Sequence, residues 1–189
     1  MNLPTRLHSV TIGVSRRWLL LVMMEMAVGL FGGCAAVLAA EADGRNTVPA
    51  DFVIKLESAP IHQQHPLQLE SIVVSADGTA LLSPRIRGAK TLEELRIQLP
   101  PDDVETIFAA MERLRFFTLE PSYTNPDVID GDYALLEVTA NGRSHRVRTQ
   151  NIRVMDFDIL ALTINTRVPA ERRVIYNALL DKSYKMVER

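Results

Sequence analysis

The stretch that decides the fold runs from Asp130 to Gln150 and reads DGDYALLEVTANGRSHRVRTQ. Within it, Asn141-Gly142 separates two runs that are rich in Val, Leu, Thr and Tyr. Asn-Gly favours a two-residue type I′ turn, because both central residues need a positive φ and these two adopt it at little cost. The stretch therefore predicts an antiparallel hairpin.

A two-residue loop also fixes which residues lie opposite each other. On one face the predicted pairs are Ala140 with Arg143, Val138 with His145, Leu136 with Val147, and Ala134 with Thr149. On the other face they are Thr139 with Ser144, Glu137 with Arg146, and Leu135 with Arg148. The first set is mostly apolar and should face the core, whereas the second is mostly polar. The opposed charges of Glu137 and Arg146 predict a cross-strand pair that contributes about 0.2–1 kcal/mol.

Residues 1–40 are predicted to be a signal peptide or a membrane anchor. An apolar run from Trp18 to Ala40 is interrupted by one charge, Glu25. The basic residues before it include Arg6, Arg16 and Arg17, and the acids Glu41 and Asp43 follow it. A basic segment before such a run is typical of export signals and anchors. By the positive-inside rule, we expect the rest of the chain to be exported to the periplasm or cell surface and anchored to the membrane.

Three fates remain open for this segment. Leu30-Phe31-Gly32-Gly33-Cys34 resembles a bacterial lipobox, which predicts lipidation of Cys34, the only cysteine in the chain. Cleavage after a small-x-small site, such as Ala40-Glu41-Ala42, is the second fate, and an uncleaved anchor is the third. Ser15-Arg16-Arg17-Trp18-Leu19-Leu20 also resembles a twin-arginine signal.

The remaining chain is long enough for one domain. Residues 41–50 are polar, contain Gly and Pro, and are predicted to be a tether, and residues 51–189 are predicted to form a single α+β domain. With one cysteine, the chain can form no intramolecular disulfide, so packing must stabilise it. The formal net charge is −2 and the basic residues are scattered, so we expect no nucleic-acid partner.

The first half of this domain is predicted to be mostly strands. Asp51–Glu57 alternates apolar and polar residues as a strand does, and residues 58–67 follow as a loop. Leu69–Ser83 is predicted to be a hairpin around Asp77-Gly78, with Val74 opposite Leu81 and Val73 opposite Leu82. Thr91–Leu99 alternates like a strand, although Thr91-x-x-Glu94 could instead cap a helical turn.

Helices are predicted in three places. Pro100-Pro101-Asp102-Asp103 opens one helix, whose apolar face is formed by Val104, Ile107, Phe108, Met111 and Leu114. Residues 118–129 are predicted to be a loop. Asp156–Arg167 should form a second helix, and Pro169–Lys182 a third with Ile175, Ala178 and Leu179 inward. This order predicts an α+β fold, in which an antiparallel sheet built from hairpins carries helices on one face and follows a hydrophobic N-terminal helix.

Candidate chemical groups are few. His62 and His65 have the spacing of two metal ligands, but prolines flank them and favour a solvated loop. His145 is predicted to be a half-buried histidine with one hydrogen bond rather than a catalytic base. Asp127, Asp130 and Asp132 lack the spacing of a calcium loop and are better explained as turn residues. The sequence contains no G-x-S-x-G, G-x-G-x-x-G or phosphate loop.

Several motifs together resemble a family of small exported bacterial lipoproteins of unknown function. They are Phe52-Val53-Ile54, Asp77-Gly78, Leu114-Arg115-Phe116-Phe117, Asp130-Gly131-x-Tyr133, Asn141-Gly142-x-x-His145-x-Val147, and the stretch from Asn165 to Pro169. The resemblance covers about residues 51–180 and implies no catalytic, cofactor or metal residues. We therefore expect a non-catalytic binding or accessory module of the cell envelope, without a cofactor and with a possible envelope protein as partner. The alternative is a metal-dependent or hydrolytic periplasmic enzyme that uses His62, His65, His145 and the Asp127–Asp132 cluster.

Overall fold

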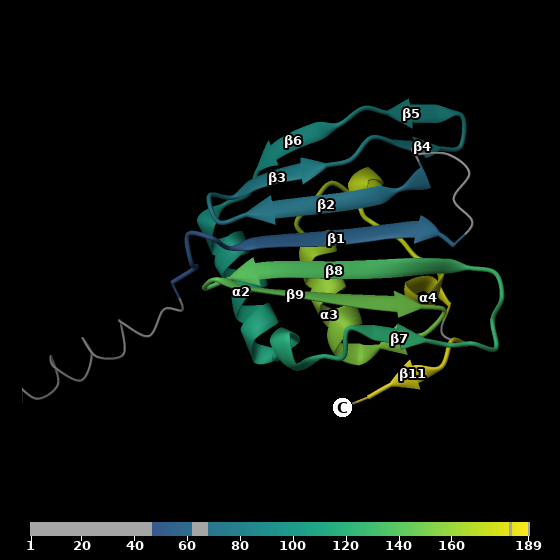
Figure 1. Ribbon diagram of the computed structural model, residues 1–189. Coiled ribbons are helices and arrows are strands. Elements are labelled where there is room, and N and C mark those ends of the chain that lie inside the picture. The colour runs from purple at the N-terminus through teal and green to yellow at the C-terminus, as the bar shows by residue number, and fades with distance from the viewer. Residues whose placement is uncertain (1–46, 62–67, 182, 189) are drawn as a thin grey trace, which may run out of the picture. The chain divides into compact units, whose positions relative to one another are not determined.

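The computed structural model describes residues 47–61, 68–181 and 183–188, which form a mixed α+β fold (Figure 1). A seven-stranded sheet has the order β6-β3-β2-β1-β8-β9-β7 and is antiparallel except where β7 runs parallel to β9. Its strands are β1 (Val53–Pro60), β2 (Glu70–Ser75), β3 (Thr79–Leu82), β6 (Leu95–Gln98), β7 (Ser122–Thr124), β8 (Asp132–Ala140) and β9 (Arg143–Gln150). Two small sheets pair β4 (Arg85–Arg87) with β5 (Lys90–Leu92), and β10 (Arg153–Val154) with β11 (Met186–Val187).

Helices α2 (Pro101–Arg113) and α3 (Met155–Asn165) lie on the same side of the seven-stranded sheet (Figure 1). α2 begins at Pro101, whose fixed φ suits a first helical residue, and acids follow in its first turn. The buried side chains of the two helices include Val104, Ile107, Phe108, Met111, Phe157, Leu160, Ala161 and Ile164. The first four are inward residues that the spacing predicts for the helix after Pro100, whereas Leu114, predicted on the same face, is half-buried just beyond its end. The second predicted helix is confirmed, with bounds shifted by one or two residues.

The hydrophobic core fills the space between this helical layer and the sheet. Phe52, just before β1, and Ile54 and Leu56 within it lie fully buried in this core, at the alternate positions that the sequence predicts. The ring of Phe52 packs edge-to-face on Phe108 of α2, with 5.3 Å between the ring centroids. This contact joins the central strand directly to the longer helix.

The central hairpin has the predicted turn and register. Asn141 and Gly142 have φ of 53° and 69°, as a type I′ turn requires, and all seven predicted residue pairs are present between β8 and β9. Glu137 lies opposite Arg146, but no salt bridge joins their side chains in the described part of the chain. The carboxylate of Asp51 accepts hydrogen bonds from the backbone N–H groups of Asn141 (2.9 Å) and Gly142 (2.6 Å), which fixes the turn from outside.

The register predicted for the Asp77-Gly78 hairpin is wrong by one residue. The structure pairs Val73 with Leu81 and Val74 with Ala80. Gly78 has a φ of 83° and donates its N–H to Ser75 O (2.9 Å), so the loop has three residues instead of two. A three-residue loop of this type ends in a left-handed glycine, and its extra residue, Ala76, shifts the pairing.

Two strand boundaries also differ from the prediction. β1 continues to Pro60, so the first residues of the predicted 58–67 loop are strand, because Ser58 and Ala59 extend the pairing with β8. Within the predicted 118–129 loop, β7 pairs in parallel with the end of β9. Thr91–Leu99 contains most of β5 and all of β6, so strand is right over the helical turn, but the predicted single strand is broken at Glu93-Glu94 and its two parts lie in different sheets.

The predicted helix Pro169–Lys182 is wrong. The chain forms a 3₁₀ turn at Ala170–Arg172, an extended segment, and only a short helix, α4 (Asn177–Leu180). The reason is a contact of the Asn165 side chain with a residue nine positions later: its Oδ1 accepts the N–H of Val174 (2.9 Å) and its Nδ2 donates to the C=O of Val174 (2.8 Å). This pair satisfies the backbone of Val174 as a neighbouring strand would, and Ile175, predicted inward, is instead exposed.

The predicted N-terminal helix, Cys34 and most of the 41–50 tether lie outside the described residues. None of the helices in the described part of the chain has the length and apolarity that a membrane span requires.

Candidate binding face of the sheet

The seven-stranded sheet has one face toward α2 and α3, and we call the opposite face, toward the viewer in Figure 1, the open face. Its side chains are those that alternate with the core residues, so neighbouring strands place them in rows across the sheet. One row contains Arg96, Leu81, Val73, Lys55, Glu137 and Arg146. The next contains Ser71, Glu57, Leu135 and Arg148.

Glu57 is the most buried acid of the open face, only 8% exposed. Its carboxylate accepts a hydrogen bond from the Tyr133 hydroxyl (3.1 Å) and pairs with Lys55 Nζ at 2.5 Å, two residues back on the same strand. Burial raises the pKa of the Tyr133 phenol, and the neighbouring Glu57 carboxylate raises that pKa further. Tyr133 therefore stays protonated and donates.

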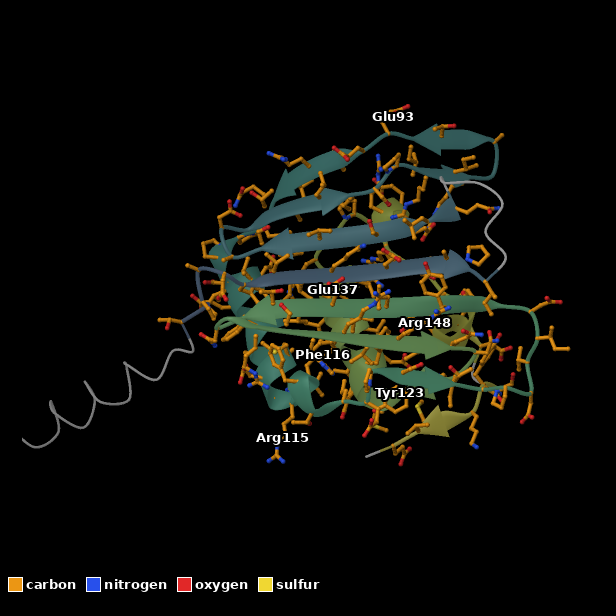
Figure 2. All side chains as sticks on the ribbon, in the orientation of Figure 1. Glu93, Arg115, Phe116, Tyr123, Glu137 and Arg148 are labelled. Atoms are coloured by element: carbon orange, nitrogen blue, oxygen red, sulfur yellow. The ribbon has the colours of Figure 1, made fainter. Side chains whose placement is uncertain are left out.

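The Arg148 guanidinium lies over the Tyr133 ring, 4.5 Å from its centroid, and donates through Nη2 to Gln150 Oε1 (3.2 Å). The stacking holds the guanidinium plane in place. Its Nε–H is buried and has no hydrogen-bond partner. The stacking therefore makes Arg148 a positioned cation, and Figure 2 labels it near Glu137 of the neighbouring strand.

Leu135 lies between Glu57 and Arg148 in its row and is only 2% exposed, although it is on the open face. Neighbouring side chains of the same face cover Leu135, because none of the described helices lies over this side of the sheet (Figure 1). Val73 and Leu81 are half-buried in the neighbouring row, and Val53 is 37% exposed at the end of β1. The open face is thus a broad surface of small apolar areas between charged groups.

Bases outnumber acids at the strand positions of the open face. The bases are Lys55, Arg96, Arg146 and Arg148, and the acids are Glu57 and Glu137. The formal net charge of the whole chain is −2, so this surplus of bases is local. A face of this charge favours a partner that carries carboxylates or other anions.

His145 lies on the opposite, core-facing side of the hairpin. Its Nε2 is 2.9 Å from the backbone oxygen of Leu119, an acceptor, so Nε2 carries the proton. Its ring packs edge-to-face on Phe116, with 5.6 Å between centroids. The half-buried position with one hydrogen bond agrees with the sequence prediction.

The aspartates of the predicted cluster do not meet His145. Asp132 is at the far end of β8 from Val138, the residue opposite His145, which is about 20 Å away at the rise of a strand. Asp127 and Asp130 are exposed, and the Asp127 N–H turns onto Asn125 Oδ1 (3.2 Å). His62 and His65 lie outside the described residues. Within the described ranges, His, Cys, Asp and Glu side chains form no group of three that could hold a metal ion.

Two buried ionic clusters hold the C-terminal segment rather than face solvent. Asp158, 3% exposed, accepts hydrogen bonds from the Tyr176 hydroxyl (2.9 Å) and Arg153 Nε (3.0 Å). Burial raises the pKa of Asp158, against the lowering effect of these two bonds. Arg85 is fully buried, pairs with Glu70 (2.9 Å), and donates to the backbone oxygens of Arg172 and Arg173.

The described residues also contain hollows, the largest of about 500 Å³ beside Asn125, Asp127 and Tyr184. A groove of about 460 Å³ runs between α2 and α3, lined by Ala109, Ile159 and Leu162 with Arg113 and Arg167 at its rim. A polar cavity of about 280 Å³ lies at the end of the sheet beside Glu70 and Asp132. Glu70 is already held by Arg85 and by the N–H of Ile175 (3.3 Å), so this cavity offers no unpaired acid from β2.

Sequence reasoning identified the polar side of the hairpin but missed the Glu57–Tyr133–Arg148 group. The outward positions of Arg148 and Glu137 follow from the Asn-Gly turn. The contact of Tyr133 with Glu57 depends on the pairing of β1 with β8, more than seventy residues apart in sequence, which no local pattern reveals.

No protein-family model matches this chain, and no curated protein is significantly similar to it.

Proposed function

We propose that this chain is a non-catalytic binding or accessory module of the bacterial cell envelope, and that its open face contacts an envelope protein through carboxylates. The observation that carries the proposal is Arg148. Its guanidinium is held in place by stacking on Tyr133, and it lies on a face where bases outnumber acids. A stacked arginine on a broad surface is the kind of residue that contributes strongly to protein interfaces.

The shape of the open face also favours a macromolecular partner. Small-molecule sites are concave and enclose most of their ligand. The open face instead alternates apolar and charged side chains over several strands, and Leu135 is covered by its neighbours instead of lining a pocket. A protein surface can cover such an area and supply an acceptor to Arg148.

The envelope location rests on the N-terminal sequence. The basic residues, the apolar run and the resemblance to small exported lipoproteins support export of residues 41–189, with the membrane contact made by the apolar segment or a lipid on Cys34. Mass spectrometry of the mature protein should find a diacylglyceryl cysteine as its N-terminus. A mature N-terminus at Asp43, or an intact Met1, would exclude lipidation.

Crosslinking of the full chain in living cells, followed by affinity recovery, tests the binding proposal. We expect one envelope protein to be recovered reproducibly, and Arg148→Ala to reduce its yield at least about tenfold, because an arginine that anchors an interface contributes about 2 kcal/mol or more. Glu112→Ala is the matched control, since Glu112 is exposed on α2, on the other side of the sheet. Equal recovery with Arg148→Ala, at an unchanged unfolding midpoint, would refute the role of the open face.

A further inference from the structure

The seven-stranded sheet ends in β6 on one side and in β7 on the other. β7 has three residues, whereas β6 follows β5 closely, so that Lys90–Gln98 runs along one border of the fold (Figure 1). In the described part of the chain, no strand pairs with the outer side of β6. An edge strand with unpaired N–H and C=O groups is a template for another strand.

The backbone groups that β6 offers at this edge can be assigned. Leu99 donates its N–H to Gly78 O (2.8 Å), so the backbone of Leu99 points toward β3. This direction alternates along a strand. Leu95 and Ile97 therefore also bond toward β3, and the N–H and C=O groups of Arg96 and Gln98 point to the open edge.

The side chains alternate in the same way. Leu95 and Ile97 are half-buried and pack against the core, so they border the edge on the helix-covered side of the sheet. Arg96 and Gln98 are exposed on the open face, opposite Leu81 and Thr79. A strand that fits this edge must place apolar side chains beside Leu95 and Ile97 and must not oppose a cation to Arg96.

We propose that the occupant is a second copy of this chain, whose β6 pairs antiparallel with the first, with Ile97 opposite Ile97 on the twofold axis. In this register Arg96 lies opposite Gln98 of the second copy, with the edge N–H and C=O groups of both bonded to each other. Leu95 lies opposite Leu99, so apolar residues meet on the core side. The surface is self-complementary, as a twofold interface requires.

The neighbouring registers are disfavoured. A register centred on Arg96 opposes two arginines, and like charges directly opposite destabilise a sheet. A register centred on Gln98 brings Pro100 opposite Arg96, and proline has no N–H to donate. If the register shifts by one residue, Arg96 of one copy faces Ile97 of the other. The N–H and C=O groups of Ile97 already bond to β3, so they cannot pair with those of Arg96. A register centred on Leu95 would place Gln98 opposite Leu92, which already pairs with Arg85 of β4, and only Leu95 and Arg96 of β6 would then face β6 or the residue next to it. The Ile97-centred register is therefore preferred.

The pairing would extend the open face through both copies. A twofold axis perpendicular to the sheet keeps both open faces on the same side, and Arg96 of each copy then lies near the junction. The two Arg148 residues would be presented on one continuous surface, which would make the module bivalent toward its partner.

A single cysteine at position 97 tests the register in the full chain. Opposed residues of a non-hydrogen-bonded pair have Cα atoms about 4.5 Å apart, within the range of about 4.4–6.8 Å that a disulfide spans. We expect Ile97→Cys to form a disulfide-linked dimer on mild oxidation in cells. In Gln98→Cys the two cysteines would be about 8 Å apart, too far to bridge, so its crosslinked fraction should be at least several-fold lower. The same variants made with Cys34→Ala, together with the unmodified chain, serve as controls. They identify any dimer that Cys34 forms.

Proline at the edge separates pairing from folding. The N–H of Arg96 faces outward, so Arg96→Pro removes no hydrogen bond to β3 but removes the donor that the second copy needs. Added to Ile97→Cys, Arg96→Pro should abolish the crosslink, whereas Arg96→Ala, which keeps the N–H, should retain it. Equal crosslinking of Ile97→Cys and Gln98→Cys, absence of any crosslink with Ile97→Cys, or a crosslink that survives Arg96→Pro would each overturn the proposal.

Discussion

At the scale of single residues, left-handed backbone positions decide where the strands turn. Gly142 has a φ of 69°, and a Cβ added there would meet no atom within 4 Å. Gly142→Val should therefore destabilise the protein through backbone strain alone, by about 1–2 kcal/mol. Urea unfolding measures this, with Asn141→Gly as the control, since glycine relieves the positive φ there. An unchanged midpoint for Gly142→Val would contradict the turn.

Gly131 is restricted by space as well as by conformation. It has a φ of 151°, and a Cβ there would lie 2.1 Å from Oδ1 of Asn151, which is itself only 1% exposed. Gly131→Ala should cost about 2 kcal/mol or more of unfolding free energy, more than Gly142→Ala. In an Asn151→Gly background, the added cost of Gly131→Ala should be smaller, because the clashing side chain is absent. Equal costs in both backgrounds would show that the two residues do not interact.

At the scale of elements, the two hairpins show what local sequence can and cannot predict. Asn141-Gly142 fills both left-handed positions of a two-residue loop, so the register followed from sequence. Asp77-Gly78 fills a three-residue loop in which only Gly78 is left-handed, and the same type of dipeptide therefore gave a register wrong by one. The loop length depends on Phe52, whose C=O accepts the N–H of Ala76 (2.8 Å), a contact between distant residues.

The segment after α3 depends on one side chain. Asn165, 4% exposed, satisfies both backbone groups of Val174, and Asn165→Ala would leave two buried polar groups unpaired. We expect a loss of about 2 kcal/mol or more in unfolding free energy. Thr166→Ala is the control, since Thr166 is exposed and should change stability by less than about 0.5 kcal/mol. A midpoint for Asn165→Ala equal to that of Thr166→Ala would mean that the Asn165 side chain does not hold this segment extended.

At the scale of the whole molecule, the α+β class and the core-facing side of β1, α2, β8, β9 and α3 followed from periodicity. β7 and the extended segment after α3 did not, because their hydrogen-bond partners come from distant strands or from a side chain. The same limit applied to the open face. The outward direction of Arg148 could be predicted, and the hairpin register also places Tyr133 diagonally from it on the same face. The Glu57–Tyr133 contact could not be predicted, because it requires the order of strands in the sheet.

The dependence of stability on pH is also a property of the whole molecule, and two aspartates should act on it in opposite directions. Burial raises the pKa of Asp158 above the ordinary value of 3.8, so the folded state binds its proton more tightly than the unfolded state. The protonation of Asp158 therefore contributes most to the free energy of unfolding below pH 3.8. This contribution is lost as the pH rises through the raised pKa. The N–H groups of Gly142 and Asn141 lower the pKa of Asp51, whose contribution is present above 3.8 and is lost as the pH falls through the lowered pKa.

Unfolding midpoints measured between about pH 2 and pH 7 for the parent chain, Asp158→Asn and Asp51→Asn separate the two effects. Relative to Asp158→Asn, the parent should lose stability as the pH rises above 3.8. Relative to Asp51→Asn, it should lose stability as the pH falls below 3.8. The difference between the parent and each variant matters, because asparagine also changes the hydrogen bonds to Tyr176 and to the turn by an amount that does not vary with pH. If the Asp158→Asn difference stays flat or slopes the other way, the bonds from Tyr176 and Arg153 outweigh burial, and Asp158 stabilises the folded chain as a carboxylate.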